Sequence, residues 1–353
     1  MKFKISFTVL LFMLGMSVAQ ADKKLAVDKV KGALSVIALG TGGPVTAATG
    51  RASAGYLIMT DGQPRILMDV GGGVYARLAE SGARLKDLDI VLLSHLHLDH
   101  TGDMSAVIKS VYFHNRQFNV PNGTFPPGRT KPVRVFGPDE NGIPFPPILG
   151  ADPTVPQYPD SAEYVHKHYD LNSGSDRYLN IFSRAISGGI FNVTGTNVSP
   201  NWQAYNPVEI INENGLVITA VGVNHGPVPA LAFRVDYKGH SIVYTGDTSS
   251  KGGNLIELAQ DVDMLIYDTA IMDNLPAGPN DAVFFSLHTT PTRMGQVAAQ
   301  SGAKTLVLSH ITPITDPRID QVKDLVRAQG FAGKIKVAKD LKVYNLDDDD
   351  DDD

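Results

Sequence analysis

The 353-residue sequence contains no cysteine. Disulfide bonds, a thiol nucleophile and cysteine metal ligands are therefore excluded, so any metal site must use histidine and carboxylate side chains. A surplus of basic residues is also absent, because 31 lysines and arginines stand against 37 aspartates and glutamates, for a net charge of -6. Binding to a phosphate backbone relies on clustered lysine and arginine. The composition therefore predicts a protein without a nucleic-acid partner.

The negative charge is concentrated at one end of the sequence. Seven consecutive aspartates, residues 347–353, form a like-charge block that we expect to be a disordered acidic tail without an assigned role. Leaving out Lys2 and Lys4 changes the net charge to -8, and leaving out the seven aspartates as well brings it to -1. The body of the protein is therefore close to neutral.

Long apolar runs are absent except near the N-terminus. There, Lys2 and Lys4 precede the apolar run 5–18, which is followed by the small-residue sequence Ala19-Gln20-Ala21. This order predicts a secretory signal peptide over residues 1–21 and a mature protein that is periplasmic or secreted. The run is too short for a comfortable transmembrane helix, so no stable membrane anchor is expected.

A dense group of possible metal ligands follows the strand-like run 89–93. His95 and His97 are two residues apart, and on an extended backbone such side chains point the same way, so both can bind one ion. Asp99 and His100 follow where the chain turns, and they can face a second ion. Imidazole and carboxylate ligands together suit zinc, with manganese or iron as alternatives.

Three later residues stand in the same context as this group. His225, Asp247 and His310 each follow directly on an apolar strand-like run. Any one of them alone would more often be structural, but their shared position at strand ends predicts that they join the first group in one metal site.

The hydrophobic pattern predicts two sheets packed together and covered by helices, a mixed α/β fold, because strands dominate early and helices alternate with strands later in each half. Asp61-Gly62 between two strand patterns predicts a hairpin. Residues 113–205 have weak periodicity, frequent proline and glycine, and many aromatic side chains. We expect this stretch to be a long irregular insertion that packs over the active site.

The run from His95 to His100, which has the form His-x-His-x-Asp-His, resembles the signature of the metallo-β-lactamase superfamily. Thr245-Gly246-Asp247-Thr248 and Ser309-His310 match later motifs of that family in the expected order. The resemblance implies an αββα sandwich formed by a single domain over residues 22–346, with two zinc ions at one edge of the sheets. It also implies that one ion is bound by His95, His97 and His225, that the other is bound by Asp99, His100 and His310, and that Asp247 bridges them.

Two further segments are similar to the branch of the family that contains transfer-RNA maturation nucleases and arylsulfatases. They are residues 224–234 and His288-Thr289-Thr290. The resemblance implies that His288 assists catalysis from outside the metal shell, while Asp99 orients the nucleophile as well as binding metal. Asp268 is a departure, since a glutamate is usual there in the nucleases.

Export, near-neutral charge and the aromatic insertion favour the arylsulfatase-like members. We therefore expect a zinc-dependent hydrolase of sulfate esters, with a metal-bridging hydroxide as nucleophile and a small aryl ester as substrate. The alternatives are a phosphodiesterase or an ester or lactone hydrolase with the same binuclear site, and a metal-binding protein without turnover. The sequence leaves the oligomeric state open.

Overall fold

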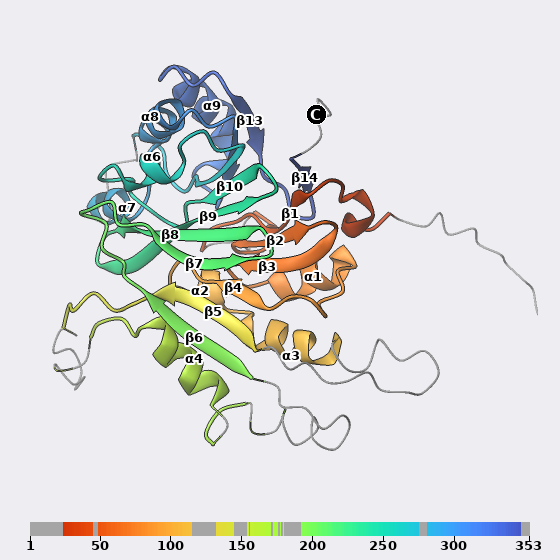
Figure 1. Ribbon diagram of the computed structural model, residues 1–353. Helices are drawn as coiled ribbons and strands as arrows, with labels where there is room; N and C mark the ends of the chain where they lie inside the picture. Colours follow the sequence, from red (N-terminus) through yellow and green to blue (C-terminus); the bar gives the residue numbers. More distant parts are fainter. Residues whose placement is uncertain are drawn as a thin grey trace, which may run out of the picture.

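The computed structural model describes residues 24–44, 49–114, 132–144, 154, 156–170, 172–175, 177, 179, 192–274 and 281–346. Two seven-stranded sheets pack face to face, and helices cover both outer faces (Figure 1). The αββα sandwich expected from the sequence is confirmed. Within the described ranges, every helix is too short or too polar to cross a bilayer.

The first sheet has the strand order β14-β1-β2-β3-β4-β5-β6. Its strands, in chain order, are β1 (Leu34–Gly40), β2 (Gly55–Thr60), β3 (Gln63–Met68), β4 (Ile90–Leu92), β5 (Val133–Pro138), β6 (Val193–Val198) and β14 (Val343–Asn345). β1, β2 and β3 pair antiparallel, and β3 to β6 pair parallel. The predicted hairpin joins β2 to β3, where Asp61 and Gly62 both have positive φ, as a type I′ turn requires.

The second sheet has the strand order β13-β12-β11-β10-β9-β8-β7. Its strands are β7 (Val208–Glu213), β8 (Leu216–His225), β9 (Val228–Tyr237), β10 (His240–Tyr244), β11 (Met264–Asp268), β12 (Thr305–Ser309) and β13 (Lys334–Val337). β7 to β10 pair antiparallel, whereas β10 to β13 pair parallel. The carboxyl ends of the parallel strands therefore lie together at one edge of this sheet.

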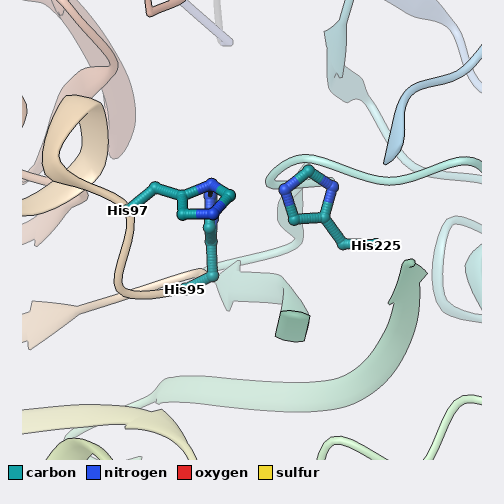
Figure 2. A group of neighbouring side chains, drawn as sticks. All are labelled: His95, His97 and His225. Atoms are coloured by element: carbon teal, nitrogen blue, oxygen red, sulfur yellow. Dashed lines mark hydrogen bonds between the residues drawn. The ribbon is translucent and has the colours of Figure 1, made fainter. Parts of the chain in front are cut away.

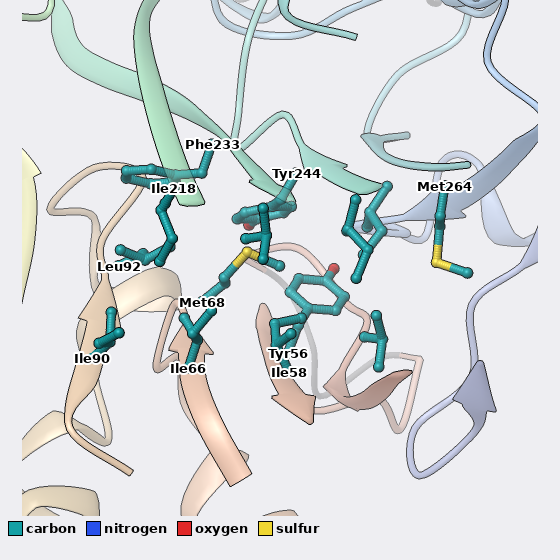
Figure 3. Packing of buried hydrophobic residues seen from close by; sticks show 14 of the residues in the cluster. Tyr56, Ile58, Ile66, Met68, Ile90, Leu92, Ile218, Phe233, Tyr244 and Met264 are labelled. Atoms are coloured by element: carbon teal, nitrogen blue, oxygen red, sulfur yellow. The ribbon is translucent and has the colours of Figure 1, made fainter. Parts of the chain in front are cut away.

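The main core lies between the sheets (Figure 3). Ile58 and Met68 from the first sheet and Ile218 and Phe233 from the second are completely buried there. Helices α1 (Val74–Ser81), α3 (Met104–His114) and α4 (Ser161–Tyr169) pack on the outer face of the first sheet, and α6 (Asn254–Leu258), α8 (Pro291–Ser301) and α9 (Ile319–Arg327) on that of the second. The shorter helices are η1 (Ala26–Lys29), α2 (Leu98–Thr101), α7 (Asp281–Leu287) and η4 (Asp316–Arg318).

The stretch 113–205, expected to be an irregular insertion, contains regular structure where it is described. β5 pairs with β4, β6 pairs with β5, and α4 packs against both strands. These parts therefore complete the first sheet. β6 is an edge strand in which Thr194 is half-buried and Thr196 is exposed, so its sequence lacks a clear apolar alternation. The rest of this stretch lies outside the described residues, as do the predicted signal peptide, 1–21, and the acidic tail, 347–353.

Candidate metal centre

The segments that follow several strands meet at one edge of the sandwich. The segment after β4 carries His95 and His97, and α2 carries Asp99 and His100. The second sheet contributes three residues: His225 ends β8, Asp247 follows β10, and His310 follows β12. All seven residues that the sequence analysis assigned to metal lie within two neighbouring groups of possible ligands.

The first group consists of His95, His97 and His225, whose ligand nitrogens lie within 4.8 Å of one another. Figure 2 shows their rings, which come from two segments far apart in the sequence. Nε2 of His95 lies 3.0 Å from Nδ1 of His97. Nδ1 of His225 donates to the carbonyl of Leu287 at 2.7 Å, and its Nε2 is buried without a hydrogen-bond partner among the described residues. A metal ion would satisfy that nitrogen.

The second group consists of Asp99, His100, Asp247 and His310. Oδ1 of Asp247 lies 3.4 Å from Nε2 of His100 and 3.2 Å from Nε2 of His310. Its other oxygen lies 3.9 Å from His95 and 4.0 Å from His225, in the first group. The Asp247 carboxylate therefore lies between the two groups, where a bridging ligand would have to be.

His288, which the sequence analysis expected to assist catalysis, lies near Asp247 and Asp268. Its Nδ1 is 2.8 Å from Oδ2 of Asp268 and 3.9 Å from Asp247. The other oxygen of Asp268 is 3.3 Å from Nδ1 of His310. Thr289 fixes the segment, because its hydroxyl donates to the carbonyl of Thr248 at 2.5 Å. Asp268 thus orients His288 by a hydrogen bond and lies within ion-pair distance of His310.

Burial and local charge divide the histidines into two classes. Desolvation lowers the pKa of His225 to about 4 and also lowers the pKa of His95, so both rings are neutral, the form that binds metal. Burial opposes protonation of His310 too, but Asp247, Asp268 and Asp99 outweigh it and raise the pKa of His310 to about 10. The carboxylates around the second group therefore favour positive charge strongly.

Two carboxylates of the centre were missed as site residues. Asp69, directly after β3, accepts hydrogen bonds from Ser94 N at 2.7 Å, Ser94 Oγ at 2.6 Å and Tyr244 OH at 2.6 Å. It also lies 2.7 Å from Nδ1 of His100, so it fixes the orientation of that ring. Asp268, which ends β11, was noted only as a departure from the nuclease pattern. Both come directly after apolar runs in the sequence, and the same feature had pointed to Asp247.

The donor set fits divalent metal ions. It consists of imidazole nitrogens and carboxylate oxygens. Three buried atoms of these residues lack a hydrogen-bond partner among the described residues: His225 Nε2, Asp247 Oδ1 and His310 Nδ1. Buried polar atoms are rarely left without a partner, so unsatisfied atoms at a ligand cluster point to a bound ion. His100 and His225 also have fixed tautomers through their outer contacts, as metal-binding histidines commonly do.

Comparison with known proteins places this geometry in a family. The family model described as "Metallo-beta-lactamase superfamily" matches residues 48–310. Among curated proteins, Ribonuclease Z of Mycobacterium avium is 28% identical over 319 residues, which cover 89% of this chain and 99% of the relative. Ribonuclease Z of Mycobacterium marinum is 28% identical over 314 residues, or 87% of this chain and 97% of the relative.

Solved structures share the fold. The human tRNase Z, short form, superimposes with a TM-score of 0.59 at 18% identity, covering 88% of this chain and 99% of that structure. The metallo-beta-lactamase fold protein YhfI of Bacillus subtilis has a TM-score of 0.57 at 22% identity, with coverage of 89% and 99%. At these identities the likeness establishes the architecture alone.

The relatives contradict the arylsulfatase-like function expected from the sequence. They are named for a ribonuclease activity, so the predicted sulfate-ester chemistry, the small aryl substrate and the exclusion of nucleic acid are wrong. The error has a physical origin. A binuclear centre does not itself select among sulfate, phosphate and carboxylic esters, and the net charge of a whole chain does not report the charge of one binding surface.

The predicted superfamily and its nuclease-containing branch are confirmed. The family model covers more than half of the chain and includes every strand-end residue of the centre from His95 to His310. The two-sheet architecture and the ordered motifs agree with it. The chain therefore belongs to the metallo-beta-lactamase superfamily.

Proposed function

We propose that this metal-dependent hydrolase is a zinc phosphodiesterase that cleaves RNA, with an activity related to that of ribonuclease Z. The observation that carries the proposal is the match to relatives of that name over 99% of their length, which spans the whole metal centre. Phosphodiester hydrolysis was already an alternative on the basis of the ligand set. A metal-binding protein without turnover is disfavoured, because the ligand groups and the Asp268–His288 pair are both complete.

The ligand groups define where two ions would be held. We assign one to His95, His97 and His225 and the other to Asp99, His100 and His310, with Asp247 shared. Two divalent cations there would supply a nucleophile from water at neutral pH and neutralise charge on the attacked phosphate. Zinc suits this mixture of imidazole and carboxylate, and manganese or iron accept similar ligands.

We assign to His288 the role of protonating the leaving oxygen. Burial opposes its protonation, but the charge and the hydrogen bond of Asp268 raise the pKa of His288 above its ordinary value. Since Nδ1 is held by Asp268 at 2.8 Å, Nε2 is the nitrogen that can donate to a substrate oxygen. Asp268 therefore both charges and orients this ring. Asp99, a member of the second ligand group, is our candidate for orienting the nucleophile.

The proposed activity is tested by comparing esters that share a leaving group. We expect zinc-loaded protein to cleave a short RNA and a nitrophenyl phosphodiester at least about tenfold faster than the sulfate and acetate analogues, a difference of ~1.4 kcal/mol in barrier. Initial rates on the set give the result. Asp247→Ala, purified in parallel, should be inactive on RNA, which excludes a contaminating nuclease. Intact RNA beside rapid sulfate turnover would refute the proposal.

Metal content tests the ligand assignment. We expect two ions per chain by elemental analysis of protein purified without chelator. His225→Ala should lose mainly one ion, and Asp247→Ala should disturb both, because the Asp247 carboxylate lies within reach of both groups. His166→Ala, whose side chain is 72% exposed on α4, is the matched control and should keep both ions. Active protein with almost no metal would rule out the binuclear assignment.

The role of His288 is tested through the leaving group. General acid catalysis typically contributes a factor of about 100 to 10,000, and it matters most for a poor leaving group. His288→Ala should keep both ions and lose far more activity on RNA, which releases a ribose hydroxyl, than on nitrophenyl esters. Asp268→Asn should shift activity in the same direction by less. An equal loss on both substrates would show that His288 only binds the anion, and loss of metal would make it a ligand.

We also propose that residues 1–21 direct export, so that the enzyme acts on RNA outside the cytoplasm. The expected product is a chain that begins near Asp22 in the periplasmic or secreted fraction, measured by intact mass. Ala19→Leu with Ala21→Leu removes the small residues that signal peptidase needs, and this variant should retain the full mass. An unprocessed wild-type chain in the cytoplasm would contradict export.

A further inference from the structure

Two tyrosines form hydrogen bonds from one sheet to the other, next to residues of the second ligand group. Tyr56 lies on β2 in the first sheet, and Tyr244 lies on β10 in the second. Both side chains are almost completely buried in the core between the sheets, and their ring centroids are 4.9 Å apart (Figure 3). A buried tyrosine hydroxyl usually finds a hydrogen-bond partner. Each of these two hydroxyls finds it on a segment of the opposite sheet.

The hydroxyl of Tyr244 leads to His100 through one carboxylate oxygen. It donates to Oδ2 of Asp69, directly after β3, at 2.6 Å. The same oxygen lies 2.7 Å from Nδ1 of His100. The Tyr244 hydroxyl therefore restricts the position of this oxygen, and the oxygen fixes how the His100 ring is turned. Nε2 of that ring faces the second ligand group, 3.4 Å from Oδ1 of Asp247.

The hydroxyl of Tyr56 leads to His310 along the backbone. It is hydrogen-bonded to the hydroxyl of Ser309 at 2.5 Å. Ser309 ends β12 and directly precedes His310. The carbonyl of Ser309 also accepts from the N–H of Thr269 at 2.8 Å. Tyr56 therefore connects the residue before His310 to the first sheet.

The backbone conformation of two residues shows why such contacts matter. The φ angle is 54° at Asp69 and 55° at His310. This left-handed region is unfavourable for residues with a side chain, which persist there where surrounding contacts hold them. His97, in the first ligand group, has an ordinary φ of -63°. The second ligand group thus depends more on contacts from its surroundings.

We propose that Tyr56 and Tyr244 are positioning residues that strengthen binding of the second metal ion by fixing His310 and His100 from opposite sheets. Neither tyrosine is itself a metal ligand, because each hydroxyl is engaged with Ser309 or with Asp69. Contacts of this kind around ligand side chains typically change metal affinity 10- to 100-fold. The inference rests on the two-ion part of the proposed function and not on RNA as the substrate.

The first ion should depend on the tyrosines much less. Nδ1 of His225 is fixed by a backbone carbonyl at 2.7 Å, without either tyrosine. Nδ1 of His95 lies 3.1 Å from Oγ of Ser94, and that hydroxyl has its own hydrogen bond to Asp69 at 2.6 Å. Loss of the Tyr244 hydroxyl leaves both contacts in place.

Removal of single hydroxyl groups tests the proposal through metal retention. Full-length, zinc-loaded protein is exposed to increasing chelator, and the zinc that remains is measured by elemental analysis. Tyr244→Phe should weaken the binding of one ion by about tenfold or more and leave the other unchanged. Tyr56→Phe should act in the same direction.

Tyr237→Phe is the matched control. Tyr237 also belongs to the core between the sheets, and its hydroxyl donates to Oδ2 of Asp61 at 2.6 Å. Asp61 lies in the turn between β2 and β3, at the opposite end of β3 from Asp69. This variant loses an equivalent hydrogen bond and should still release zinc as the wild type does. If all three variants lowered the retention of both ions equally, the tyrosines would have only a structural role and the proposal would fail.

The His225→Ala background identifies the ion that is weakened. This variant should retain mainly the ion of the second group, so adding Tyr244→Phe should lower its retention by the same factor. Unchanged retention there would overturn the proposal, and the proposed function would stand if the wild type holds two ions. A wild type that holds only one ion would contradict the binuclear assignment and the tyrosine roles together.

Discussion

The buried Asp247 carboxylate is the group on which the rest of the centre depends. It is only 2% exposed, and a buried charge of this kind requires close compensation. Five imidazoles supply it, each with a nitrogen within 4.0 Å: those of His95, His100, His225, His288 and His310. These rings come from both sheets, so the carboxylate connects the two halves of the sandwich. Two further carboxylates contact these histidines from the side away from Asp247. Asp69 lies next to Nδ1 of His100, and Asp268 lies next to Nδ1 of His310.

The polar groups of the centre lie at one edge of the sandwich, so they do not interrupt the apolar core between the sheets. The space between the sheets is filled with apolar side chains, such as Ile218 and Phe233, and gains its stability from burial. Polar residues are then confined to segments that follow the strands, where the backbone turns and no longer pairs in the sheet. Because these segments are anchored in rigid strands, the side chains can be held in fixed positions. The fold thus separates the stabilising core from the reactive centre.

The sequence was sufficient where function and local pattern coincide. Each predicted ligand follows an apolar run, so the strand and the chemistry are visible together. Asp69 and Asp268 also follow apolar runs. Their role is to contact the histidines His100 and His288, and these contacts are visible only in the three-dimensional structure. β6 was missed for a different reason. Its threonines give no alternation, and its pairing with β5 joins residues that are distant in sequence.

The substrate was predicted wrongly because the prediction used the net charge of the whole protein and not the local charge of its surfaces. A body with a net charge of -1 argued against a polyanion, yet Lys304, Lys334 and Lys336 line one cavity at the end of the second sheet. Charges of opposite sign that are separated in space cancel in the total but not in the local potential, which decides what binds at a surface. The same holds at the metal centre, where bound cations would outweigh nearby carboxylates in attracting a phosphate. Net charge therefore describes the solubility of this protein better than its choice of substrate.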